Sequence, residues 1–236
     1  MRSFLIALSF LTRLPVPRID ASAADFARAV RLYPFVGLLI GALVAGVAWA
    51  GALVDPWLGA LAGVLAWTWV TGALHLDGLA DLADGLGAAH GNRDRLLTVM
   101  ADPHVGSFGV VALVLQIAAK LVLLCLLLPH GALAVMTVPA AARIGPLVWA
   151  WRLPPLRPGG LGASIAGAVR PRDLFAWAGG LIALCVVLPP LAITPLVLLA
   201  LGAWFKRRIG GVTGDVHGAG IELTETALLV ALLAQP

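Results

Sequence analysis

An uninterrupted apolar run is the feature that most limits how this chain can fold. Residues 32–54 contain no charged side chain. A helix of about 20 apolar residues crosses the hydrocarbon core of a bilayer. The whole chain has the same character, because 61% of its residues are hydrophobic and 12% are charged, against roughly 45–50% and 25% in soluble domains. The sequence therefore excludes a soluble domain, a disordered chain and a disulfide scaffold. It predicts one integral membrane domain over residues 1–236.

Seven apolar segments predict an all-α, polytopic helical bundle of about seven transmembrane helices, with a range of six to eight. Prolines at 189, 190 and 195 divide the longest segment into two short spans, since proline interrupts a helix. A count of six leaves the last segment re-entrant or interfacial. The expected spans are 32–54, 57–74, 108–128, 131–151, two within 174–205, and about 218–235.

The basic residues predict the orientation. Fourteen of the sixteen lysines and arginines lie in four alternate connections, and the short turns between the other spans contain none. Basic connections remain in the cytoplasm, so we expect a multi-pass protein of the cell inner membrane. The net charge of +4 then reflects insertion into a lipid bilayer and no nucleic-acid partner. The basic connections are 1–31 (an N-terminal interfacial segment), 75–107 (Asp-rich), 152–173 and 206–217 (Gly-rich).

An acidic motif within residues 75–85 is the strongest functional signal. Asp77, Asp81 and Asp84 are spaced i, i+4, i+7, so they share one face of a helix. A solvated polar face is the plain alternative, but the residues between them are Leu, Ala and Gly rather than Lys or Arg. Carboxylate oxygens suit hard cations. The motif therefore predicts a Mg²⁺ site and a diphosphate substrate, with the catalytic region facing the cytoplasm.

Further polar residues follow in the same connection. Asp102 is a candidate to complete the metal ligands. His104 is a candidate phosphate donor, although a lone histidine is more often a structural hydrogen-bonding group. Arg93 and Arg95 are the nearest cations in sequence, and we assign them to substrate binding.

A glycine-rich stretch, 210–218, lies on the same predicted side of the membrane. Glycines let backbone N–H groups approach a phosphate. Gly211, Thr213 and Gly214 are therefore candidate substrate-binding residues, and Asp215 is a candidate metal ligand. A structural turn before the last span is the alternative.

Four charged residues fall inside predicted spans. Carboxylates there are costly unless they serve a site, which makes Glu222 and Glu225 candidates. Lys120 and Arg143 either pair with these acids or reach phosphate from within the bundle. On the alternative that it reaches phosphate, Lys120 is assigned to substrate binding.

With these residues in place, the sequence resembles the cobalamin synthase family, the adenosylcobinamide-GDP ribazoletransferases. The likeness runs nearly end to end and is sharpest at the acidic motif. Leu82, Pro103-His104 and His217 depart from the family's usual Thr, Ser-Arg and Leu. The similar stretches are 10–17 (FLTRLPVP), 33–37 (YPFVG), 75–86 (HLDGLADLADGL), 102–109 (DPHVGSFG), 160–162 (GLG) and 210–215 (GGVTGD).

The resemblance implies a Mg²⁺-dependent transferase that completes the nucleotide loop of adenosylcobalamin. It joins adenosylcobinamide-GDP to α-ribazole, or to its 5′-phosphate, and releases GMP. A homo-oligomer is left open. The implied metal ligands are Asp77, Asp81, Asp84 and Asp102, with Asp215 as a further one. The catalytic candidates for the general base are Asp81, Asp84, His75 and Glu222.

Two other classes remain as alternatives. A CDP-alcohol phosphotransferase also carries an Asp-Gly-rich face on a membrane helix, but it has Ala-Arg where this chain has Ala80-Asp81. A membrane transporter places its ionisable residues near the middle of the bilayer. Here the acids cluster at one predicted membrane face.

Overall fold

Helices form all the regular structure in the described part of the chain. The computed structural model describes residues 1–157 and 161–234. Position 160, which the sequence assigns to a cytoplasmic connection, lies outside the described residues. The predicted all-α class is confirmed. The α-helices are α1 (Arg2–Leu11), α2 (Ala23–Ala29), α3 (Tyr33–Ala52), α4 (Pro56–Thr71), α5 (Leu74–Ala89), α6 (Arg93–Val99), α7 (Ser107–Leu127), α8 (Ala132–Ala142), α9 (Gly145–Arg152), α10 (Leu161–Ile165), α11 (Pro171–Val187), α12 (Thr194–Arg208) and α13 (Gly214–Leu233). The 3-10 helices are η1 (Val30–Leu32), η2 (Leu128–His130) and η3 (Pro189–Ile193).

Five helical segments of the described chain are long and apolar enough to cross a membrane. A sixth crossing arises if α4 and α5 count as one broken span, because they meet at a bend of 86°. These helices support a polytopic membrane protein. The five segments are Ala23–Ala52, Ser107–His130, Ala132–Arg152, Pro189–Arg208 and Gly214–Leu233.

The expected count of seven differs from this in two places. The segment expected as a straight span over 57–74 ends at Thr71, where Gly72 and Ala73 both adopt left-handed backbone with φ near 60°. A left-handed backbone costs a residue with a Cβ roughly 1–2 kcal/mol, so alanine rarely adopts it. An alanine at position 73 therefore gives no sign of the bend in the sequence. The other difference is α11, which has only 17 residues. The last segment is a full 20-residue helix rather than a re-entrant piece.

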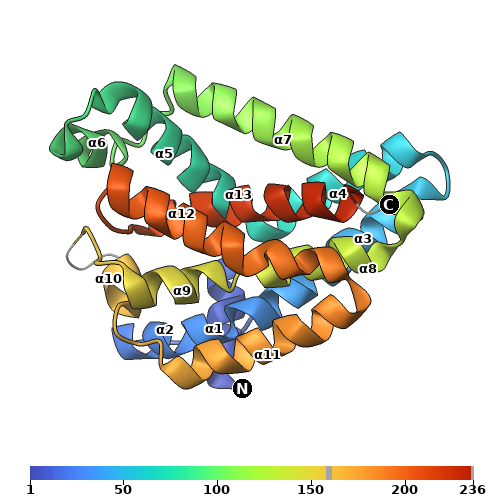
Figure 1. The fold of residues 1–236 in the computed structure, drawn as a ribbon, viewed down its shortest axis with the longest axis horizontal. Coiled ribbons are helices and arrows are strands. Elements are labelled where there is room, and N and C mark those ends of the chain that lie inside the picture. Colours follow the sequence, from blue (N-terminus) through green and yellow to red (C-terminus); the bar gives the residue numbers. More distant parts are fainter. Residues whose placement is uncertain (158–160, 235–236) are drawn as a thin grey trace.

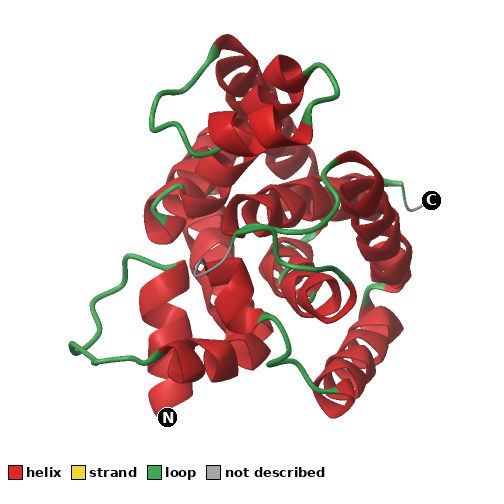
Figure 2. Cartoon of the chain, turned by 90° about the vertical axis from the view of Figure 1, so that its left-hand side faces the viewer, coloured by secondary structure: helices red, strands yellow, loops and turns green. Residues whose placement is uncertain are grey.

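The connections separate to two ends of the bundle. The turns between α3 and α4, between α7 and α8, and between α11 and α12 lie together at the right in Figure 1, and α6 and α10 lie at the left. Figure 2 looks from the α6 and α10 end and shows several helices nearly end-on. The turns without basic residues therefore share one end.

Close helix packing depends on small residues. A Cβ at Gly37 of α3 would lie 2.5 Å from the Pro139 carbonyl oxygen of α8. A Cβ at Gly59 of α4 would lie 2.6 Å from the Ala48 carbonyl oxygen of α3. Small residues let helix backbones approach closely in membranes, where apolar side chains gain nothing by leaving lipid. The carboxylate of Asp55 caps α4 and fixes this hairpin by accepting from Trp57 N–H at 2.8 Å.

The final helix, α13, occupies the centre of the bundle. It contacts α5, α7, α8, α9 and α12, and most of its side chains are buried (Figure 1). In contrast, α7 and α11 expose valine, leucine and isoleucine side chains. The apolar outer helices are therefore suited to contact lipid, while α13 carries polar residues inward.

The grouping of the connections generates a topology prediction. In a variant in which Cys125 and Cys185 are replaced, cysteines at positions 90, 160 and 207 will react only when a membrane-impermeant maleimide reaches the cytoplasmic face. Cysteines at 54 and 130 will react from outside intact cells. Position 54 is chosen for the outer turn because a cysteine at 55 would remove the Asp55 carboxylate that caps α4. Labelling of position 160 or 207 in intact cells would contradict this orientation.

Candidate functional site

A network of four buried charges connects the middle of α13 to its neighbours. Lys120 of α7 lies 2.7 Å from both Glu222 and Glu225. Arg143, which follows α8, lies 2.9 Å from the other oxygen of Glu225. The Gln116 amide donates to Glu222 at 2.7 Å. Two cations thus offset two carboxylates. Of the two alternatives for Lys120 and Arg143, the structure shows pairing with Glu222 and Glu225. Lys120 and Glu222, assigned from sequence to substrate binding and catalysis, both lie in this network.

His75 extends the network to α5. Its Nδ1 lies 3.4 Å from Nη2 of Arg143. A guanidinium only donates hydrogen bonds, so Nδ1 accepts and the proton resides on Nε2. Nε2 has no hydrogen-bond partner among the described residues. This tautomer makes His75 a hydrogen-bond donor rather than a general base.

The acidic motif packs directly against the first turns of α13. A Cβ at Gly78 would lie 2.6 Å from the Asp215 carbonyl oxygen, and one at Gly218 would lie 3.3 Å from Cα of His75. Only glycine permits this approach at Gly78. The packing explains why two stretches more than 130 residues apart in the chain form one surface.

Three aspartates meet at this surface. The carboxylates of Asp77 and Asp81 have no hydrogen bond or ion pair within residues 1–157 and 161–234. Asp215 accepts from Arg157 at 3.2 Å and from Thr213 at 3.4 Å. The charges of Asp77, Asp215 and Arg157 all act on Asp81. Asp77 and Asp81 are therefore free to bind a cation or substrate, and Asp215 is held beside them.

Arg157 is a site residue that no motif in the sequence indicates. It also donates to the Leu97 carbonyl oxygen at 3.2 Å, so it joins α6 to the start of α13. Its surroundings in sequence are Pro, Leu and Gly, which carry no charge pattern. Only the fold brings it to the aspartates.

Asp84 has a different environment from the other motif aspartates. Its two carboxylate oxygens accept from the backbone N–H groups of Gly106 and Gly109, at 2.7 and 2.8 Å. These amides belong to the N-terminus of α7, where N–H groups lack intrahelical partners. A carboxylate there also interacts favourably with the helix dipole. Asp84 thus caps α7 from another helix.

The remaining polar candidates of the 75–107 connection make no hydrogen bond or ion pair with Asp77, Asp81 or Asp215 in the described part of the chain. Asp102 and His104 are exposed, and the His104 ring lies 2.7 Å from the Asp102 carboxylate. Hydrogen bonds from the backbone and then the ring of His104 lower the pKa of Asp102 below its usual range. Arg95 is exposed. Arg93 lies against Gly210 and lines a separate cavity of about 230 Å³.

The glycine-rich stretch has mixed roles. Thr213 is buried, and its hydroxyl caps α13 by accepting from Val216 N–H at 3.2 Å. Gly211 is needed for packing, because a Cβ there would collide with the Pro154 carbonyl. Gly214 has open space where a Cβ would lie. Only Gly214, at the N-terminus of α13, retains the geometry expected for backbone contact with a phosphate.

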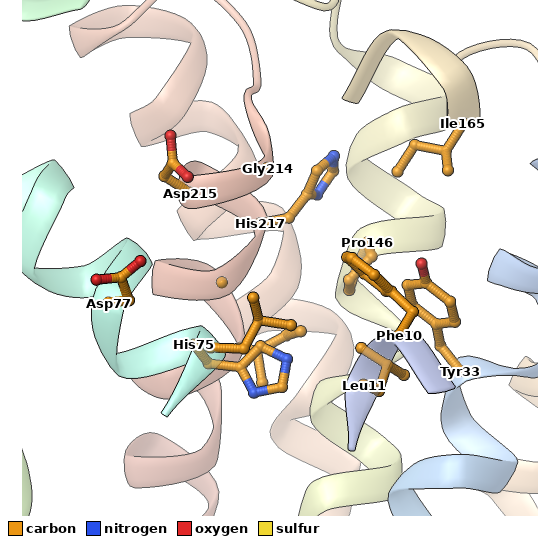
Figure 3. A pocket seen from close by; sticks show the side chains of 13 residues that line it. Phe10, Leu11, Tyr33, His75, Asp77, Pro146, Ile165, Gly214, Asp215 and His217 are labelled. Carbon is orange, nitrogen blue, oxygen red and sulfur yellow. The ribbon is translucent and has the colours of Figure 1, made fainter. Parts of the chain in front are cut away.

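A cavity of about 110 Å³ adjoins the aspartates. Figure 3 shows Asp77 and Asp215 at one side, apolar and aromatic side chains at the other, and His75 and His217 between them. The apolar side comes from α1, α3, α9 and α10. The lining residues are Phe10, Leu11, Tyr33, Leu74, His75, Asp77, Pro146, Ile165, Gly214, Asp215, His217, Gly218 and Ile221.

The chemistry of the aspartates fits a magnesium ion shared with a ligand. In the described part of the chain, no three His, Cys, Asp or Glu side chains are grouped closely enough to hold a metal alone. Mg²⁺ usually binds one or two protein carboxylates together with substrate phosphates and water. Unpaired Asp77 and Asp81, with Asp215 nearby, match that arrangement.

The chain is similar to one family over nearly its full length. A family model described as cobalamin-5-phosphate synthase matches residues 3–233. A relative from Novosphingobium aromaticivorans, named adenosylcobinamide-GDP ribazoletransferase, is 59% identical over 98% of this chain and 96% of its own length. Relatives with the same name are 51% identical in Thiobacillus denitrificans (98% and 94% coverage) and 42% identical in Pseudomonas aeruginosa strain UCBPP-PA14 (98% and 98%). No solved structure matches the chain.

The capping role of Asp84 predicts a difference between the motif aspartates. Asp84→Asn will lower the free energy of unfolding by about 1–3 kcal/mol, because an amide cannot accept from both N–H groups. Asp77→Asn removes like-charge repulsion and will leave stability unchanged or slightly higher. Thermal unfolding of both variants in detergent measures this difference. Equal stability of the two variants would refute the capping role.

The buried network predicts a stability effect that depends on charge balance. Lys120→Met leaves the two glutamates with one cation, and breaking a buried pair costs about 3–5 kcal/mol. Lys120→Met combined with Glu222→Gln restores neutrality and leaves the Arg143–Glu225 pair intact, so it will recover most of the lost stability. Unfolding midpoints of the single and double variants test this. A double variant as unstable as Lys120→Met would show that packing, not charge, is responsible.

Proposed function

Because the chain belongs to the cobalamin-5-phosphate synthase family, we propose that its substrates are adenosylcobinamide-GDP and α-ribazole or its 5′-phosphate. The family match confirms the membership that the motifs predict. The protein is a transferase of cobalamin nucleotide-loop assembly. The observation that supports a catalytic site at α5 and α13 is the pair of unpaired carboxylates, Asp77 and Asp81, beside Asp215 and a cavity.

The proposed reaction is a displacement at phosphorus. The hydroxyl oxygen of the ribazole forms a bond to the phosphorus that carries the corrinoid. The bond from that phosphorus to the bridging oxygen breaks, GMP leaves with the bridging oxygen, and the hydroxyl proton passes to a base. Such reactions depend mainly on positioning and on electrostatic stabilisation of the phosphoryl oxygens.

The charged side chains support this chemistry in distinct ways. Arg157 supplies a guanidinium beside Asp215, and the open N-terminus of α13 at Gly214 supplies backbone N–H groups. Both are suited to bind phosphate oxygens. Asp77 and Asp81, with Asp215 nearby, would hold Mg²⁺ together with the diphosphate, and the ion would neutralise charge on the phosphate oxygens.

Asp81 is the proposed general base. Among the four sequence candidates, Asp84 accepts two backbone N–H groups, Glu222 is paired with Lys120, and Nδ1 of His75 accepts from Arg143. The Asp81 carboxylate has none of these partners and is partly exposed. One of its two oxygens is therefore available to accept a proton when the other binds Mg²⁺.

The proposed location is the cell inner membrane, with the site facing the cytoplasm. The basic connections and the site share one end of the bundle, which the positive-inside rule assigns to the cytoplasm. Nucleotide-bearing substrates would reach the site from that compartment. The family match does not favour the phospholipid head-group enzyme or the transporter considered from sequence.

Substitution of the unpaired aspartates tests the proposal. Asp77→Asn and Asp81→Asn will each reduce GMP release to below a tenth of the wild-type rate, a loss above about 1.4 kcal/mol of transition-state stabilisation. Asp215→Asn will lower kcat more than it raises KM, because Asp215 is held beside the reacting phosphate. Steady-state kinetics of detergent-purified protein with Mg²⁺, normalised to folded protein, measure these effects.

Asp94→Asn serves as the matched control, because Asp94 is exposed on α6 and lies outside the aspartate cluster. Its activity will remain near wild type. Retention of wild-type rates by Asp77→Asn and Asp81→Asn would contradict the proposed site.

A further inference from the structure

We propose that the cavity beside Asp77 and Asp215 is the subsite for the aromatic base of the incoming nucleoside, with His217 as the donor to its ring nitrogen. This inference rests on the proposed function, since it assigns one of the two substrates to a place in the structure. The ligand class is a nucleoside with a benzimidazole-type base: planar, bicyclic, largely apolar, and with one accepting ring nitrogen.

The wall opposite the aspartates has the character of an aromatic-base site. Phe10 of α1 and Tyr33 of α3 are near-parallel, with ring centroids 6.1 Å apart and planes at 25°. Pro146 and Ile165 complete this side of the cavity (Figure 3). Sites for flat organic ligands are mostly apolar, with a few polar groups that set orientation. The lining has this composition.

His217 is the polar group that points to a ligand. Its side chain is 6% exposed, it lines the cavity, and neither ring nitrogen has a hydrogen-bond partner among the described residues. Buried polar groups are normally hydrogen-bonded, because leaving one unpaired costs free energy. A ring nitrogen of a bound base would satisfy His217.

The orientation of His217 is held by its neighbours. Its ring stacks on Trp149, with centroids 6.0 Å apart and planes at 25°. Trp149 is itself fixed, because its Nε1–H donates to the Leu198 carbonyl at 2.9 Å and Phe205 packs edge-on at 5.3 Å. The His217 ring is therefore held in one orientation and loses little side-chain freedom on binding, which favours affinity.

The position of the aspartates gives the nucleoside a direction. A base between the apolar wall and His217 places its ribose toward Asp77 and Asp215, on the opposite side of the cavity (Figure 3). The ribose hydroxyl then lies beside the residues proposed to bind the diphosphate. One cavity would thus hold the base and orient the nucleophile.

The lining also discriminates between bases. A benzimidazole nucleoside has one free ring nitrogen and otherwise apolar edges, so a single donor satisfies it. A purine carries further ring nitrogens, and adenine an exocyclic amine, for which the described lining side chains offer, apart from His217 and the aspartates, only Nε2 of His75 and the Tyr33 hydroxyl. Unpaired polar groups in a buried site reduce binding strongly. We therefore expect a preference for the benzimidazole base.

Direct binding of α-ribazole to the purified full-length protein tests the inference without turnover. Isothermal titration calorimetry in detergent will show that His217→Leu weakens α-ribazole binding at least tenfold, because the donor to the ring nitrogen is lost. His217→Gln keeps an N–H donor and will recover part of the affinity. Ile165→Phe fills the cavity and will abolish binding. His130→Leu, at the opposite end of the bundle, is the matched control and will bind like wild type.

Kinetics separate this inference from the proposed function. In His217→Leu, KM for α-ribazole will rise about tenfold while KM for adenosylcobinamide-GDP stays within about twofold. Active variants with an unchanged KM for α-ribazole would overturn the subsite and leave the function intact. If the wild-type protein binds α-ribazole but shows no turnover, and His217→Leu loses that binding, the subsite is supported and the proposed function is overturned. Equal affinity for α-adenosine and α-ribazole would overturn the assigned base class. If His217→Leu does not fold, Ile165→Phe and His217→Gln still decide the outcome.

Discussion

The structure depends on neutralising four charges inside an apolar bundle. Lys120, Arg143, Glu222 and Glu225 are each at most 4% exposed, and together they carry no net charge. A buried ion without its partner costs several kcal/mol, more than most single packing contacts contribute. Since both glutamates are on α13, this requirement fixes that helix between α7 and α8 at the centre of the molecule.

The same chemical group has two roles along α13 and α5, according to its surroundings. The glutamates deep in the bundle are fully paired and act in the fold. Asp84 is satisfied by backbone amides and also acts in the fold. The carboxylates of Asp77 and Asp81, on the same helix as Asp84, have no partner among the residues that the structure describes. The difference between a structural and a chemical carboxylate is therefore set by neighbours, and not by residue type or spacing.

Sequence patterns predict much of this molecule, and their failures have physical causes. Apolar runs and prolines locate most helices, and the charge distribution separates the two ends. The bend at Gly72 and Ala73 escapes prediction because Ala73 adopts a conformation that alanine rarely takes. The i, i+4, i+7 spacing places three aspartates on one face but cannot show that Asp84 meets the start of α7. Arg157 and the wall formed by Phe10 and Tyr33 depend on contacts between distant segments. Phe10 and Tyr33, unlike Arg157, could have been found from sequence, because both lie in stretches that resemble the family.

The central place of α13 has a consequence for how the protein is made. The ribosome makes α13 after α7 and α8, yet α13 carries both anions that neutralise Lys120 of α7 and Arg143 after α8. During synthesis, Lys120 and Arg143 therefore precede their partners into or beside the bilayer by more than 75 residues of chain. An isolated charged side chain is costly in lipid. We therefore expect the Lys120 and Arg143 side chains to stay hydrated, in the insertion machinery or at the membrane surface, until α13 is synthesised. Assembly of this bundle is thus a late event, and a chain released before α13 emerges would hold two unpaired cations and no catalytic surface.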